Sequence, residues 1–248
     1  MRDQGGHYSL HFPLSTYFST SLLFHFSTFP VMLTAFTGLL AGFLHVLAGP
    51  DHLAAVAPIA ADRPRGWIAG WTWGLGHASG VIVVALLAVL LRDLLPPVET
   101  ISVWGERLVG GALIAVGIWA IRRSAHLEAA PHAHGPRLHG HLHVQAGPAW
   151  MRRLGHAHAS FYLGVLHGVA GSSHFFGVLP ALALPSRAAA LTYIGAFGIG
   201  TVAAMVAFAG AVGCVGNHAR HGAPAHRILM KATALVAIVV GGFWLISA

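Results

Sequence analysis

The sequence predicts an all-α membrane protein in which six transmembrane helices form two inverted three-helix repeats. Charged residues make up 8% of the chain and hydrophobic residues 56%, whereas about a quarter of the residues in soluble domains are charged. The chain also contains an internal duplication. The segment Gly42-Phe-Leu-His45-Val-Leu-Ala-Gly49-Pro50-Asp51-His52 returns, at an offset of 122 residues, as Gly164-Val-Leu-His167-Gly-Val-Ala-Gly171-Ser-Ser-His174.

Six apolar segments are long enough to cross a bilayer, which takes about 20 residues. They cover roughly 33–60, 67–91, 104–121, 159–182, 188–215 and 228–247. The first and fourth contain the duplicated motif, and the second and fifth contain the related sequences Trp73-Gly-Leu-Gly76 and Phe197-Gly-Ile-Gly200. Each half therefore has three spans. Because three is odd, the halves enter the membrane in opposite senses, as in many transporters.

The rest of the chain divides around these two halves. We expect residues 1–31 to be an N-terminal extension outside the core, followed by a first repeat at 32–125, a His-rich loop at 126–158 and a second repeat at 159–248. Basic residues follow segments one, three and five, namely Arg63, Arg65, Arg122, Arg123, Arg137, Arg152, Arg153, Arg220, Arg227 and Lys231. The opposite side has only Arg2, Arg92, Arg107 and Arg187. The positive-inside rule therefore predicts a multi-pass protein of the cytoplasmic (inner) membrane, with the His-rich loop in the cytoplasm.

The duplicated motif places ionisable groups inside a span. An Asp at the centre of a bilayer costs about 2.5–3.5 kcal/mol, so such a group usually has a function. In a continuous helix, His45 and His52 would lie about 10.5 Å apart along the axis, too far to bind one metal ion. Gly49 and Pro50 are expected to break the helix, because proline removes a hydrogen bond to the carbonyl of Val46 and clashes with the preceding turn. Broken helices at the midplane are where secondary transporters place their ions.

The donor set of this motif indicates a metal ion. Two imidazoles and a carboxylate suit nickel, cobalt, zinc, iron or copper, whereas magnesium and calcium prefer more oxygen ligands. The predicted metal-binding residues are His45, Asp51, His52, His77, His167 and His174. Because the second copy of the motif has Ser172 and Ser173 in place of Pro50 and Asp51, it lacks the carboxylate, and two roles stay open for His167 and His174: completing one asymmetric site or lining the exit path. The glycines beside His77 are expected to allow a close approach to the first segment. The alternative for an isolated intramembrane histidine is a hydrogen bond between helices.

The loop at 126–158 forms a second histidine cluster. Its histidines are separated by Pro, Gly and Ala, and we expect the loop to be disordered because it shows no apolar periodicity. Short His-rich tracts are typical of metal binding, and a low-complexity linker is the alternative. The predicted auxiliary metal-binding residues are His132, His134, His139, His141 and His143.

The stretch from His45 to His52, followed by Leu53-Ala-Ala-Val56, resembles the nickel/cobalt transporter superfamily, and within it the branch of urease-accessory-type transmembrane proteins. That superfamily carries a His-x4-Asp-His signature on an early transmembrane helix. The spacing here, with five residues between His45 and Asp51, is one residue longer. The resemblance implies translocation of nickel or cobalt, with His45, Asp51 and His52 as the metal-selecting positions.

The sequence therefore favours a secondary transporter of a divalent transition metal, not an enzyme. The transported metal and the lipid bilayer are its expected partners, without a permanently bound cofactor or nucleic acid, and a homo-oligomer stays open. Two alternatives are an intramembrane metalloenzyme and a proton-coupled exporter of small organic solutes. The single cysteine, Cys214, excludes an internal disulfide, a redox cysteine pair and a thiolate zinc site. The direction of transport, the metal and the coupling ion are not fixed by the sequence.

Overall fold

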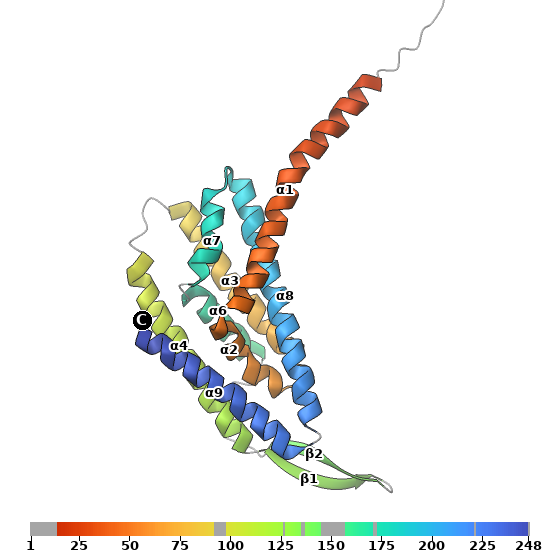
Figure 1. Cartoon of the computed structure of the whole chain (residues 1–248), viewed down its shortest axis with the longest axis vertical. Coiled ribbons are helices and arrows are strands. Elements are labelled where there is room, and N and C mark those ends of the chain that lie inside the picture. Colours follow the sequence, from red (N-terminus) through yellow and green to blue (C-terminus); the bar gives the residue numbers. More distant parts are fainter. Residues whose placement is uncertain are drawn as a thin grey trace, which may run out of the picture.

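The computed structural model describes residues 14–91, 98–125, 127–134, 137–144, 157–170, 173–220 and 222–247. Within these residues the chain forms eight helices and one hairpin of two strands (Figure 1). The helices of the first half are α1 (Leu14–Ala48), α2 (Pro50–Ala61), α3 (Gly66–Leu91) and α4 (Val98–Ala125). The hairpin follows, with strands β1 (Leu127–His134) and β2 (Arg137–Val144). The helices of the second half are α6 (Ala157–Ala170), α7 (Ser173–Ala183), α8 (Arg187–Ala219) and α9 (Ala223–Ser247).

Five helices of the described chain are long and apolar enough to cross a membrane. The qualifying stretches are Val31–Ala48, Gly66–Ala88, Trp104–Ala125, Arg187–Ala219 and Pro224–Ser247. A multi-pass helical membrane protein is therefore supported. The predicted fourth segment, at 159–182, is divided into the two shorter helices α6 and α7. Helix α1 begins at Leu14 and passes residue 31 without a break, and its first part projects from the bundle (Figure 1).

The first segment is also interrupted, and the break lies at Gly49. This residue has an extended backbone (φ −90°, ψ 103°) and caps α2, whose first residue is Pro50. Proline is favoured at this position because its missing N–H would have no partner there. The expected loss of a partner by the carbonyl of Val46 is wrong. The amide of Gly49 donates to that carbonyl at 3.3 Å and to the carbonyl of His45 at 3.1 Å.

The helices pack in pairs that combine the two halves of the chain. Helix α1 packs against α8, α3 against α6 and α8, and α4 against α9. The counterparts of α1, α3 and α4 in the second half are α6, α8 and α9. Exchanging the counterparts turns the pair of α1 and α8 into the pair of α6 and α3, and leaves the pairs of α3 with α8 and of α4 with α9 unchanged. The pairing therefore follows the internal duplication that is visible in the sequence.

Glycines allow the closest of these approaches. A side chain at Gly168 of α6 would overlap the backbone of His77 in α3, and one at Gly80 of α3 would overlap the backbone of Val165 in α6. The glycines near His77 were expected to face the first segment, but they face α6 and α8 instead. This close contact of α3 and α6 is what brings His77 near the second copy of the motif.

One end of the bundle is held together by charged and polar contacts. The Nε atom of Arg123, at the end of α4, lies 2.9 Å from Oδ2 of Asp62, which follows α2. Arg220, which follows α8, donates to the backbone carbonyl of Asp62, and Asn217 donates to the carbonyl of Pro64 at 2.6 Å. Burial lowers the pKa of Arg220, while the Asp62 carboxylate opposes this shift. The chain segments after the first, third and fifth predicted spans therefore meet at the same end.

Residues 127–134 and 137–144 of the His-rich segment form a hairpin and not the disordered loop that the sequence analysis expected; the rest of the predicted loop up to His156 lies outside the described residues. Strands β1 and β2 pair antiparallel, with Leu127 opposite Val144 and His132 opposite His139. A period of two explains the difference: in Arg137–Val144, Arg and His alternate with Leu, Gly and Val, which is the pattern of a β-strand. Helix α9 contacts β1, so the hairpin lies at the end of the bundle where α9 begins (Figure 1).

Candidate metal centre

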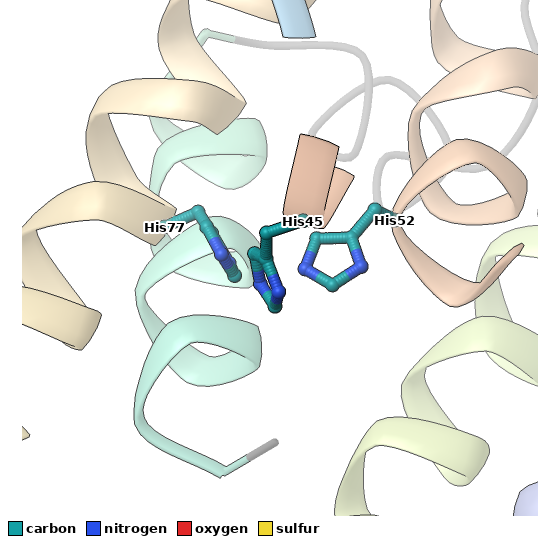
Figure 2. A group of neighbouring side chains, drawn as sticks. All are labelled: His45, His52 and His77. Carbon is teal, nitrogen blue, oxygen red and sulfur yellow. The ribbon is translucent and has the colours of Figure 1, made fainter. Parts of the chain in front are cut away.

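Four of the predicted metal-binding histidines converge inside the bundle. His45 lies in the last turn of α1, His52 in the first turn of α2, His77 in the middle of α3 and His167 in the last turn of α6. In a straight helix, His45 and His52 would be far apart along the axis. The break at Gly49 brings them together, and the centroids of their rings are only 4.6 Å apart. Figure 2 shows His45, His52 and His77 with their rings directed toward one common point.

The donors form two overlapping groups that share His52. One group is His45, His52 and His77, and the other is Asp51, His52 and His167. Within each group, one ligand atom per residue lies within 4.8 Å of the others. The ring centroids of His77 and His167 are 4.8 Å from that of His52. Side chains separated by this distance can close onto one metal ion with small movements, since metal–nitrogen bonds are about 2.0–2.1 Å long.

Asp51 connects two of the histidines. Its Oδ1 atom is 2.9 Å from Nδ1 of His52, and its Oδ2 atom is 3.2 Å from Nε2 of His167. The carboxylate therefore joins the first copy of the motif to the second. Asp51 is only 2% exposed, and His52 and His77 are fully buried. These groups lie in an apolar bundle, where an ionised carboxylate needs such partners.

Aromatic residues form the walls of the centre. The ring of Phe197 lies 5.4 Å from His45, and the ring of Trp73 lies 6.1 Å from His167. Phe197 and Trp73 hold equivalent places in the two halves, as do His45 and His167. The sequence analysis did not assign these aromatics to the site, although the paired sequences that begin at Trp73 and Phe197 contain the signal. Trp73 and Phe197 are themselves buried, each only 2% exposed.

The duplication is not complete at the chemical level. Asp51 has Ser173 as its counterpart, and His77 has Thr201, a fully buried residue whose hydroxyl donates to the carbonyl of Gly42 at 3.4 Å. The donors are thus concentrated on elements of the first half, with His167 contributed by the second. His174 lies at the start of α7, and its side chain is outside the described part of the structure.

The remaining predicted histidines lie away from this centre, in the hairpin. The register places His132 opposite His139, His134 opposite Arg137, His141 opposite Ala130 and His143 opposite Glu128. Their side chains are outside the described part of the structure. The hairpin backbone therefore carries these five histidines on two strands that are separate in sequence from the donors in the bundle.

The chain is similar to known proteins over more than four fifths of its length. Two chloroplast proteins of Arabidopsis thaliana, "FOR GROWTH AND FERTILITY 2" and "FOR GROWTH AND FERTILITY 1", are each 36% identical to the chain, over 216 and 213 residues. These matches cover 85% and 84% of the chain but only 55% and 57% of the relatives, so the chain spans little more than half of their length. The urease accessory protein UreH of Bacillus sp. (strain TB-90) is 28% identical over 212 residues, which are 82% of the chain and 86% of UreH. No family model and no solved structure matches the chain.

Proposed function

We propose that the protein is a secondary transporter that moves a divalent transition metal across the cytoplasmic membrane, with nickel or cobalt as its preferred substrate. The observation that carries this proposal is the set of four histidines and one carboxylate that meet at a helix break inside the bundle. A buried, nitrogen-rich donor set of this kind favours nickel, cobalt, copper or zinc over magnesium and calcium. Similarity to a urease accessory protein adds support for nickel.

The contacts of Asp51 suggest how the centre selects and holds its substrate. A carboxylate that accepts a hydrogen bond from one ring nitrogen fixes the orientation of the ring and makes the other nitrogen a better ligand. With Nδ1 of His52 beside Asp51, Nε2 of His52 is the atom available to the metal. His45 and His77 then supply the other nitrogens of the same group. His167, on the far side of Asp51, supplies a second position for the ion.

The arrangement of the helices supports transport rather than permanent binding. Both copies of the motif lie at interruptions in the first element of a half, one at Gly49 and one between α6 and α7. Two inverted halves that rock about such interrupted helices would open the centre first to one side of the membrane and then to the other. We place the charged end of the bundle, with Asp62 and Arg123, in the cytoplasm, together with the His-rich hairpin as an auxiliary metal-collecting surface.

The two alternatives differ from this proposal in what they require. A di-metal oxidase site needs several carboxylates, and Asp51 is the only carboxylate in the described donor groups. An exporter of organic solutes would work in the absence of metal. The test is uptake of radioactive nickel, cobalt and zinc into vesicles that contain the purified protein. Saturable uptake of nickel or cobalt, abolished by chelation, is expected. Tight, redox-active metal without flux would indicate an enzyme, and solute export that persists under chelation would indicate the other rival.

A further inference from the structure

One face of α3 lines two cavities that lie one after the other along the helix. Ile68, Trp71, Leu75, Ala78 and Ile82 recur every three or four positions, so they lie along one face of the helix. Ile68 lines a cavity of about 270 Å³ together with Arg63, Pro64 and Arg65. The other four residues line an apolar groove of about 440 Å³ between α3 and α8. Along α3, a basic pocket is therefore followed, one helical turn later, by an apolar groove.

The groove exists because α8 has glycines where it faces α3. At Gly195, an added Cβ atom would meet nothing within 4 Å, and at Gly198 it would meet the side chain of Ile82 at 3.2 Å. From Trp71 to Ile82 the groove follows α3 for about 16 Å, at 1.5 Å per residue. One leaflet contributes about 15 Å of the hydrocarbon core of a bilayer. The groove thus has the length and the apolar lining that an acyl chain needs.

The pocket at the end of the groove is basic. Arg63 and Arg65 lie in the turn between α2 and α3, while the neighbouring carboxylate of Asp62 already contacts Arg123 at 2.9 Å. Burial lowers the pKa of Arg63, and the charge of Asp62 opposes this shift. Arg63 is partly buried and Arg65 is exposed, and both line the pocket, so the pocket presents two basic side chains. Guanidinium groups bind phosphate through paired hydrogen bonds.

We propose that the turn and the groove form a binding site for one anionic phospholipid, with the phosphate of the headgroup on Arg63 and Arg65 and one acyl chain between α3 and α8. Charge complementarity selects the headgroup, and the apolar groove continues from that point into the depth of one leaflet. The exposed side chains of Trp67 and Trp71 lie between the two parts, where tryptophan is enriched at the boundary between headgroups and hydrocarbon. This site is independent of the metal centre.

Native mass spectrometry of the full chain, titrated in detergent with phosphatidylglycerol or phosphatidylcholine of the same acyl chains, tests the proposal. The wild-type protein is expected to retain one phosphatidylglycerol in preference to phosphatidylcholine. The double variant Arg63→Gln/Arg65→Gln should lose this preference, with about a tenfold weaker binding of phosphatidylglycerol. Arg187→Gln, which changes an arginine at the start of α8, is the matched control and should bind like the wild type. If the double variant does not fold, Arg65→Gln alone carries the test, because Arg65 is exposed.

The groove has its own variant and control. Gly195→Leu should fill the groove and weaken binding of both lipids, whereas Gly111→Leu, which also meets open space but lies on α4, should change neither. The proposal is overturned if the wild type binds both lipids equally or if the arginine variants keep the preference. It is also overturned if inorganic phosphate displaces the lipid completely, which would indicate a simple anion site. A change from dimer to monomer in Gly195→Leu would instead assign the groove to a second copy of the chain.

Discussion

At the scale of single residues, Asp51 determines the geometry of the centre. It lies between His52 of α2 and His167 of α6, so one carboxylate orients a histidine from each half of the chain. From the duplicated motif, the sequence left two roles open for His167: completing one site with Asp51 and His52, or lining the exit path. It could not predict the bridge, since the bridge depends on how closely glycines let α3 and α6 approach.

Asp51→Asn tests this role directly. The amide keeps the shape of the side chain but removes the charge that orients the two imidazoles, so nickel binding should weaken by about 10–100-fold, as for other residues that hold metal ligands in place. Isothermal titration of the purified protein measures this. His218→Ala, at the exposed end of α8, is the control and should bind nickel like the wild type. An unchanged nickel affinity in Asp51→Asn would show that Asp51 does not support metal binding.

Gly49 provides a second test at this scale. A methyl group at this position would lie 2.9 Å from both Oδ1 of Asp51 and Cε1 of His52, which is too close for either atom to stay in place. Gly49→Ala should therefore weaken nickel binding by at least about tenfold, as displaced metal-site partners do. Pro50→Ala should have a much smaller effect, because Pro50 only occupies the first position of α2. Equal effects of the two substitutions would contradict the assignment of the break to Gly49.

At the scale of elements, much of the helical pattern was predictable, because long apolar runs and repeated motifs mark most of the spans. The division of the fourth segment into α6 and α7 was missed, since its sequence has Ser172 and Ser173 where the first copy has Pro50 and Asp51. The hairpin was also missed. We expected a disordered metal-binding loop because the segment has no apolar periodicity, although its alternation of histidine with small or apolar residues has a period of two, which is a strand pattern.

The hairpin allows a prediction about metal collection. Deleting 127–144 should leave the bundle folded, because in the described structure β1 and β2 pair mainly with each other, and the main contact between the hairpin and a helix is that of β1 with α9. Nickel uptake from the hairpin side should show a weaker apparent affinity and a nearly unchanged maximal rate. This difference should fade as the pH falls through about 6.5, where histidine takes up a proton and stops binding metal. Loss of all uptake at saturating nickel would instead make the hairpin part of the transport path.

At the scale of the whole molecule, the two halves are joined at one end by Asp62, Arg123 and Arg220. The sequence predicted that the segments around these residues lie on the same side of the membrane, and the contacts of Asp62 bring them together. The positive-inside rule predicts that this side is the cytoplasm, and the orientation stays a prediction. Accessibility labelling of single cysteines, in a background where Cys214 is replaced, should place residue 65 in the cytoplasm and residue 187 outside. Labelling of residue 65 from the outside would reverse the orientation.

The central claim is that the buried histidines carry a metal ion across the membrane. Uptake of radioactive nickel into vesicles with purified protein tests it most directly, with wild type, His52→Ala and His218→Ala compared at equal amounts of inserted protein. His52 belongs to both donor groups, so its loss should abolish uptake, while His218→Ala should transport like the wild type. Nickel uptake by His52→Ala at the wild-type rate, or no uptake of any transition metal by the wild-type protein, would contradict the account.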